Sequence, residues 1–251
     1  MHPILFSLGN VRIYTHGLMI AAGAFLGGML IFYLAKRKGL KFSFLFDTLV
    51  YSLFCGIIGA RILYIILYYY QFENWKTMFY LWQGGLVSFG GILLGFLTAG
   101  LILRKFHQNI LKWFDIGVIG LFLGWSIGRI GCLLTGDIPG VSTLSKIALW
   151  GQVPVALLES IWSLALAILL SYLMLKKNKL ISRLGDGFIF LSGLGGYFLG
   201  RFVIDFWRDE RTLWLFRSSQ IGDIIMFLII LMILSLYYIK PLVSKERIDH
   251  A

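Results

Sequence analysis

The sequence predicts an all-α, polytopic membrane protein with about seven transmembrane helices, and three observations lead to this fold class. Hydrophobic residues make up 59% of the 251 residues, charged residues only 14%, and the mean hydropathy is +0.83. The apolar residues form continuous runs of about 20, the length that crosses a bilayer as a helix, instead of the alternating pattern of barrel strands. The loops between the runs alternate between rich and poor in Lys and Arg. We expect residues 1–251 to form a single integral membrane domain.

The candidate spans follow one another between charged or turn-rich breaks. They cover roughly residues 14–34, 44–69, 84–103, 114–134, 153–175, 184–205 and 220–239. The first run has neither a preceding basic segment nor a following small-residue cleavage site, so we expect no cleavable signal peptide. Both cysteines, Cys55 and Cys132, fall within spans, which argues against a disulfide framework and against a zinc site.

The basic residues predict the orientation of the chain. Of the 23 Lys and Arg residues, fourteen follow the first, third, fifth and seventh spans, whereas six lie in the N-terminal segment and the other loops. Lys and Arg accumulate on the cytoplasmic side of membrane proteins, so the N-terminus is expected outside and the C-terminus in the cytoplasm. The same bias accounts for the net charge of +11, and we therefore expect no nucleic-acid partner.

The last three basic residues, Arg61, Arg129 and Arg201, lie inside the second, fourth and sixth spans. Intramembrane ionisable residues are candidates for functional sites, although a single arginine can also snorkel to the nearest interface. Each of the three lies in the later half of an outward-running span, so all should approach the outer leaflet. Snorkelling would scatter them to both faces, and a shared site is therefore the preferred interpretation. Further residues that are polar or are candidates for the site should lie at the same depth in the outer leaflet: His16, Ser88, Phe89, Asp137, Gln220 and Asp223.

The sixth span makes this site more specific. Tyr197, Arg201 and Asp205 are spaced by four residues and therefore share one helix face, with Arg208 close to it. Such a face can bind an anion and position a proton acceptor, but an internal pair of Arg201 with Asp205 would explain two of the residues. Arg129 has no acidic residue in its own span. Guanidinium binds phosphate through bidentate hydrogen bonds, so this surplus of arginine suggests a phosphate ligand.

Glycine is concentrated in the stretch WQGGLVSFGGILLG, residues 82–95. Small residues allow close approach of helices in lipid, and this is the preferred interpretation for most of them. Gly84 and Gly85, at the outer end of the third span, could also free backbone N–H groups for a ligand. The glycine-rich patterns of nucleotide-binding loops are absent.

Several ordered motifs together resemble the prolipoprotein diacylglyceryl transferase family of the bacterial inner membrane. They are THGLM at 15–19, ARILY at 60–64, GGLVSFGG at 84–91, GRIGCLLTGDIPG at 128–140, PVALLE at 154–159 and YFLGRFVIDFWR at 197–208. The resemblance implies a multi-pass protein of the bacterial cytoplasmic membrane. It also implies transfer of diacylglyceryl from phosphatidylglycerol to the lipobox cysteine of a preprolipoprotein signal peptide. This reaction forms a thioether, releases glycerol phosphate and uses neither a metal nor an organic cofactor.

The resemblance also implies roles for residues. Arg129 and Arg201 would bind the lipid phosphate, Tyr197 would orient a group or relay a proton, and Asp205 would hold Arg201 in place. Further contacts to the phospholipid are expected from Arg61, Arg208, Gly84, Gly85 and Gly140, the last of which ends the signature-like stretch.

This chain departs from the family pattern at five positions. Phe89 and Val153 stand where histidines are usual, His16 replaces a tyrosine, and Cys132 and Asp137 replace asparagine and glutamate. His16 is the first candidate for the general base because its ordinary pKa is close to neutrality, and Asp137 is the second. An interfacial histidine without a catalytic role is the alternative for His16, and Cys132 is interpreted as a small apolar filler.

These departures leave two other functions open. The first is a non-catalytic or altered-substrate paralogue that binds an anionic phospholipid at the outer leaflet. The second is a transporter, which is disfavoured because the two halves of the chain show no convincing repeat.

Overall fold

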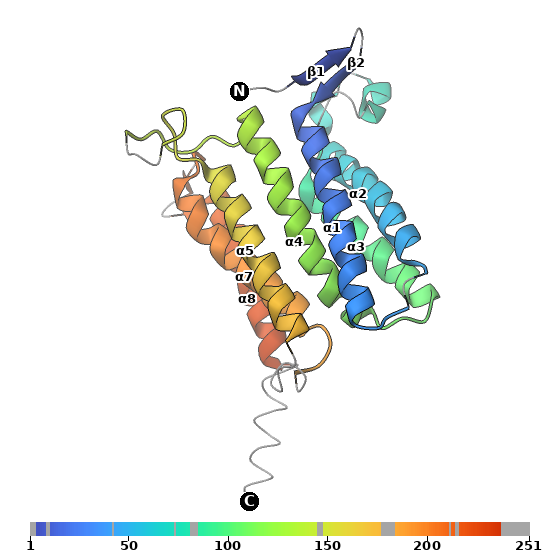
Figure 1. Cartoon of the computed structure of the whole chain (residues 1–251). Helices are drawn as coiled ribbons and strands as arrows, with labels where there is room; N and C mark the ends of the chain where they lie inside the picture. Colours follow the sequence, from blue (N-terminus) through green and yellow to red (C-terminus); the bar gives the residue numbers. More distant parts are fainter. Residues whose placement is uncertain are drawn as a thin grey trace, which may run out of the picture. The chain divides into compact units, whose positions relative to one another are not determined.

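The structure is a computed structural model and describes residues 4–8, 11–41, 43–72, 74–80, 85–144, 148–176, 184–210, 212–213 and 216–236. Its α-helices are α1 (Thr15–Arg37), α2 (Leu45–Tyr68), α3 (Ser88–Lys105), α4 (Ile110–Thr135), α5 (Val155–Leu175), α7 (Phe188–Ile204) and α8 (Ser218–Leu234), as Figure 1 shows. Five of these segments, α1, α2, α4, α5 and α7 with its extension to Trp207, are long and apolar enough to cross a membrane. This confirms an all-α membrane protein, whereas the count of seven spans and the orientation of the termini remain predictions.

Short strands and 3-10 turns occupy the connections, and hydropathy did not predict them. β1 (Ile4–Leu8) pairs antiparallel with β2 (Val11–Tyr14), and β3 (Thr212–Leu213) pairs antiparallel with β4 (Phe216–Arg217). The 3-10 turns are η1 (Tyr69–Gln71), η2 (Trp75–Phe79) and η4 (Asp205–Trp207). The last of these directly continues α7, so that the helix changes from α to the tighter 3-10 geometry at Asp205.

The chain divides into two compact units, one of residues 39–113 and one of residues 1–38 together with 114–251. The single integral domain therefore stays a prediction. In the smaller unit, α2 packs against α3 through glycine. A Cβ atom on Gly59 would lie 2.5 Å from the carbonyl oxygen of Gly90, so this glycine is needed for close helix packing, as expected for helices in lipid.

The larger unit contains α1, α4, α5, α7 and α8, whose axes run in similar directions in Figure 1. Gly23 and Gly27 of α1 face Gly124 and Gly120 of α4 so closely that added Cβ atoms would collide with the opposite backbone. The hydroxyl of Ser160 on α5 donates to the carbonyl oxygen of Ser126 on α4 at 2.8 Å. α7 packs against both α5 and α8. Glycine thus lets α1 and α4 approach closely, and serine joins α4 to α5.

A buried aspartate fixes one end of α7. Asp115 of α4 accepts hydrogen bonds from the backbone N–H groups of Gly187 and Phe190, each at 2.7 Å. The first N–H groups of a helix have no partner within the helix, and here a side chain of a different helix supplies one. Asp115 therefore acts as a cap from outside α7.

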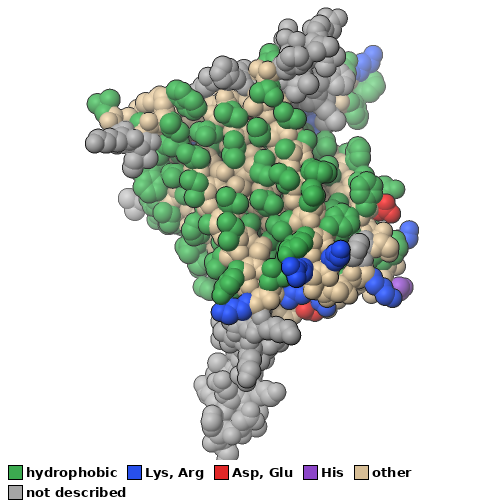
Figure 2. All heavy atoms as spheres, viewed as in Figure 1, with side chains coloured by type: hydrophobic (Ala, Val, Ile, Leu, Met, Phe, Trp, Pro, Cys, Tyr) green, Lys and Arg blue, Asp and Glu red, His purple; other side chains and the backbone are tan. Residues whose placement is uncertain are grey.

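The molecular surface agrees with a membrane environment. On the face shown in Figure 2, hydrophobic side chains cover the middle of the helices, whereas Lys and Arg gather toward one end. Many large apolar side chains of α1 and α5 are exposed, among them Phe25, Met29, Ile161 and Ile168. Such a surface fits contact with lipid better than contact with water.

Candidate functional site

A buried glutamate joins two arginines at one end of the larger unit. Glu159 lies in the first turns of α5 and is only 2% exposed. Its Oε2 lies 2.6 Å from Nε of Arg129, which comes from the last turns of α4. Its Oε1 accepts a short hydrogen bond from Nη2 of Arg208, in the segment after α7. One carboxylate therefore positions two guanidinium groups from different elements.

The series of charges continues through Asp205, which is fully buried at the end of α7. Nε of Arg208 lies 3.1 Å from its Oδ1, and Nε of Arg201 lies 3.7 Å from its Oδ2. Arg201 also lies 3.5 Å from Asp223 of α8, and its Nη1 donates to the hydroxyl of Tyr197 at 3.5 Å. The face predicted in the sixth span is thus present, and it forms part of a larger network.

Neighbouring polar groups complete the network. Nη1 of Arg217 donates to the carbonyl oxygen of Asp205, and the backbone N–H of Arg217 donates to Oε1 of Gln220 at 2.9 Å. Nη1 of Arg208 also lies 3.1 Å from Oε1 of Glu210. Burial alone would raise the pKa of Glu210, but hydrogen bonding to Ser219 and to Arg208, together with the positive charge of Arg208, outweighs burial, and the pKa lies below its ordinary value. Burial opposes the charged form of Arg208 as well, yet the negative charges of Glu159 and Asp205 raise its pKa.

The network corrects the expectation of surplus arginine. Arg129 does have an acidic partner, Glu159, which comes from a different span. The four arginines of the network (Arg129, Arg201, Arg208 and Arg217) are balanced in formal charge by four carboxylates (Glu159, Asp205, Glu210 and Asp223). A phosphate ligand therefore cannot be argued from excess charge and has to be argued from hydrogen-bond donors. Each guanidinium has N–H groups on two terminal nitrogens in addition to Nε.

The two candidates for a general base lie next to each other in the larger unit. Nδ1 of His16, in the first turn of α1, lies 3.9 Å from Oδ2 of Asp137 and 3.7 Å from Sγ of Cys132. The hydroxyl of Thr135 donates to the same Oδ2 at 2.6 Å. Cys132 is buried, whereas about 40% of the His16 side chain and 56% of the Asp137 side chain are exposed. Cys132 is therefore a polar neighbour of His16, in addition to filling space.

Arg61 has a structural role in the smaller unit, and its assignment as a phosphate ligand stays a prediction. Its guanidinium donates to the carbonyl oxygens of Met78, Thr77, Tyr80 and Gly85, at 2.7 to 3.2 Å. These hydrogen bonds occupy all three of its nitrogens and hold the segment between α2 and α3. Arg61 is thus buried, and its guanidinium is enclosed by carbonyl oxygens.

Of the other predicted positions in the smaller unit, the structure describes Gly85 and Phe89 but not Gly84. Gly85 has a positive φ of 77°, and a Cβ there would lie 2.5 Å from the ring of Tyr64, so conformation and packing both require glycine. Phe89 is 57% exposed at the start of α3. Gly84 lies outside the described residues.

Gly140 supports Arg208 through the backbone. It forms an antiparallel bridge with Arg208, and the backbone N–H of Asp209 donates to the carbonyl oxygen of Pro139 at 3.0 Å. A Cβ at Gly140 would collide with the carbonyl oxygen of Val153. Gly140 therefore allows three backbone segments to meet, and this holds the backbone of Arg208 in place.

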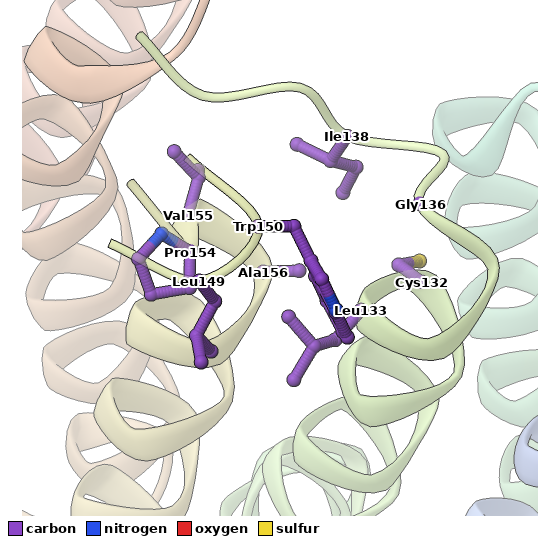
Figure 3. Close-up of a pocket in the computed structure, with 9 residues that line it drawn as sticks. All are labelled: Cys132, Leu133, Gly136, Ile138, Leu149, Trp150, Pro154, Val155 and Ala156. Atoms are coloured by element: carbon purple, nitrogen blue, oxygen red, sulfur yellow. The ribbon is translucent and has the colours of Figure 1, made fainter. Parts of the chain in front are cut away.

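Two cavities lie in the larger unit, and a residue of the network, Arg217, lines one of them. One of about 30 Å³ lies beside α4 and the start of α5, and Figure 3 shows the Trp150 ring beside Leu133 in it. The other, of about 780 Å³, is mostly apolar and has Arg217 in its wall. It lies along α5 and the end of α7, between Leu158, Ile161, Trp162 and Phe206. Among the described residues, no group of three or more His, Cys, Asp or Glu side chains could hold a metal ion.

Comparison with known proteins identifies the family. The sequence model of the prolipoprotein diacylglyceryl transferase family matches residues 3–238. The chain belongs to this family. A phosphatidylglycerol–prolipoprotein diacylglyceryl transferase of Clostridium botulinum (strain Loch Maree / Type A3) is 31% identical, with 98% of this chain and 99% of the relative covered. A protein of the same name from Clostridium kluyveri (strain ATCC 8527) is 30% identical, with 99% and 100% covered. The chain is thus a transferase of lipoprotein biosynthesis with membrane helices.

Glu159 is the main residue of this diacylglyceryl transferase that the prediction of site residues missed. Glu159 is the last residue of the motif PVALLE. A glutamate inside an apolar run is a candidate for a functional site in the same way as an arginine there. Its two partners lie 30 and 49 positions away in the sequence, so no helical spacing could reveal the pairing. Arg217 was likewise missed, because it acts through the backbone carbonyl of Asp205. Gln220 was expected at this level, and the structure adds its hydrogen bond to the carbonyl oxygen of Phe202.

Proposed function

We propose that this transferase moves the diacylglyceryl group of phosphatidylglycerol to the lipobox cysteine of a preprolipoprotein, and forms a thioether at the outer face of the bacterial cytoplasmic membrane. The names of its relatives include phosphatidylglycerol and prolipoprotein, which supports both substrates. The observation that carries the proposal is the shared position of Arg129, Arg201 and Arg208. Three guanidinium groups from separate segments are linked through two buried carboxylates, Glu159 and Asp205.

This arrangement suits a phosphate better than a neutral ligand. The carboxylates engage the Nε edge of Arg129 and Arg201, which restrains both side chains before a substrate binds. Their terminal nitrogens can then donate to phosphate oxygens. Fixed donors in a site with little water stabilise the charge that develops on a leaving phosphate. Tyr197 orients Arg201 through its hydroxyl, and Asp205 restrains both Arg201 and Arg208.

The apolar cavity of about 780 Å³ supports a lipid substrate. Its volume lies within the usual range of ligand pockets, and Ile161 and Phe206 on its wall are exposed. Arg217 joins this wall to the carbonyl oxygen of Asp205. An acyl chain in the cavity would therefore lie close to the arginine network.

The proposed reaction is a displacement at carbon. His16 takes the proton of the substrate thiol, since the thiolate is the nucleophile, and Asp137 is the second candidate for this step. The thiolate attacks the glyceryl carbon that carries the phosphate oxygen, so that a C–S bond forms and the C–O bond breaks. Glycerol phosphate leaves with the bonding electrons beside Arg129 and Arg201. The imidazolium then returns its proton to the leaving phosphate or to water.

Complementation tests the proposal. The chain is expressed in bacteria whose own transferase is depleted, and prolipoprotein is followed by gel shift and mass spectrometry. We expect the lipobox cysteine to gain the mass of diacylglyceryl with the native chain and with Arg37→Ala, an exposed arginine that contacts Tyr33. Arg129→Ala should abolish the gain. An inserted native chain that gives no modified cysteine would overturn the proposal and favour the lipid-binding paralogue, which the phenylalanine at position 89 also permits.

A further inference from the structure

Cys132 lies beside His16 in a way that filling space does not explain. The thiol is buried, and its Sγ lies 3.7 Å from Nδ1 of His16, which is within hydrogen-bond range for sulfur. In Figure 3 the sulfur points away from the Trp150 ring and the small cavity. The imidazole of His16 is thus a polar contact of the thiol, and the side chain of Arg129 also acts on the thiol.

A carboxylate reaches the same imidazole nitrogen. Oδ2 of Asp137 lies 3.9 Å from Nδ1 of His16, too far for a direct hydrogen bond but close enough for electrostatic attraction. Thr135 donates to this oxygen at 2.6 Å, and this fixes the carboxylate. Within the part of the chain that the structure describes, both partners of the His16 ring are at Nδ1.

Two acceptors at Nδ1 determine which nitrogen of the neutral ring is basic. In a neutral imidazole one nitrogen carries the proton and the other accepts one, and the hydrogen bond made by the first decides between them. Sulfur is a weak acceptor, and the carboxylate of Asp137 adds negative charge on the same side. A proton on Nδ1 is therefore favoured, and Nε2 is left unprotonated.

We propose that Cys132 is a positioning residue for His16: its sulfur accepts from Nδ1–H and keeps Nε2 turned toward the incoming substrate thiol. This inference rests on the proposed role of His16 as the general base. Without the sulfur, Nδ1 would have only Asp137 at 3.9 Å, and the ring could rotate. With it, the proton taken up at Nε2 gives an imidazolium that the carboxylate of Asp137 stabilises.

The charged surroundings of the pair come from several elements. Asp137 follows α4, and Arg129 and Glu159 are the other charged groups that act on the Cys132 thiol. His16 is the only titratable residue in Thr15–Ala22, the first two turns of α1, and the phenol of Tyr14, just before them, is exposed. Among the described residues, Cys132 and Asp137 are therefore the polar groups next to the His16 ring.

The pH dependence of kcat/KM tests the inference. Purified enzyme is assayed with phosphatidylglycerol in mixed micelles and a lipobox peptide, at pH values from 5 to 9. Removal of a residue that orients a metal-bound histidine usually costs about 10-fold to 100-fold, and we take this as the scale for an oriented base. Cys132→Ala should therefore lower kcat/KM by at least about tenfold and shift the limb of the profile that His16→Gln removes. Cys132→Ser, which keeps an acceptor, should restore most of the rate, and the KM for the phospholipid should not change.

Three controls make each outcome decisive. Cys55→Ala, at the other cysteine, should leave rate and profile unchanged, and thermal unfolding in detergent should show that Cys132→Ala is folded. The double variant His16→Gln/Cys132→Ala should be no slower than His16→Gln, because Cys132 acts only through His16. If His16→Gln removes the limb but Cys132→Ala keeps the native profile, this inference alone is wrong. If His16→Gln keeps rate and profile while product still forms, the base assignment is wrong and the inference falls with it.

Discussion

Replacement of Glu159 by glutamine tests the central ion pairs of the network. The substitution keeps the size of the side chain and one acceptor oxygen, so that it removes the charge with little change in packing. Glu159 is the only carboxylate within 4 Å of Arg129 among the described residues, whereas Arg208 keeps Asp205 and Glu210. Arg129 is therefore the group that would be left as an uncompensated charge in a mostly buried place.

The expected loss of stability follows from this difference between Arg129, which loses its acidic partner, and Arg208, which keeps two. Removal of one partner of a buried pair costs about 3–5 kcal/mol, and the lower end applies here because Arg208 retains two acids. For a chain of this size, about 3 kcal/mol corresponds to a fall in Tm of roughly 6–12 °C. The matched control is Glu210→Gln. Its carboxylate also pairs with Arg208, but its side chain is 30% exposed, so that its loss should cost less than about 1 kcal/mol.

Thermal unfolding in a single detergent, with and without phosphatidylglycerol, provides the assay. The double variant Arg129→Gln/Glu159→Gln should be more stable than the sum of the single changes predicts, by about 1–3 kcal/mol for groups in contact. If Glu159→Gln lowers the Tm no more than Glu210→Gln does, the buried pair with Arg129 does not stabilise the fold. Additive effects of the two single changes would likewise show that Arg129 and Glu159 are not coupled.

Three further predictions use other parts of the chain. Asp115→Ala should lower the Tm by several degrees, because the loss of a cap with two backbone partners costs about 1–3 kcal/mol. The activity per folded molecule at low temperature should not change. A reduced kcat together with a native Tm would contradict the purely structural role of Asp115. Arg61→Lys should cause proteolytic nicking of the segment between α2 and α3, since an ammonium group cannot reach four carbonyl oxygens arranged around a planar guanidinium; native resistance to protease would count against this. Because the pKa of Glu210 is lowered in the folded protein, its contribution to stability is present above its unfolded value of about 4.3 and is lost as the pH falls through the folded value. The difference in Tm between the native chain and Glu210→Gln should therefore shrink below about pH 4.3, and a constant difference down to pH 3 would be incompatible with the lowered pKa.

The long helices could be predicted from the sequence because their signal is local. Continuous apolar runs predicted α1, α2, α4 and α5 to within a few residues, since each helix has to satisfy its own backbone and bury its own surface in lipid. The face of Tyr197, Arg201 and Asp205 was predictable for the same reason, because helical spacing alone sets it.

The pairing of the polar residues depended on the tertiary structure. Arg129 meets Glu159 where α4 packs against α5, next to the contact between Ser126 and Ser160, and such contacts have no fixed sequence spacing. Arg61 shows the converse: its position in an apolar run resembled that of Arg129, but the carbonyl oxygens around it make it a structural residue.

By itself, the sequence determined that the chain is a helical membrane protein with arginines in its apolar segments, because hydropathy and helical periodicity are properties of short stretches. Only the tertiary structure decided which arginines are paired, with which acids, and which of them are enclosed by backbone. Hydrogen bonds and ion pairs depend on distances of a few ångströms between helices, and those distances are set by packing.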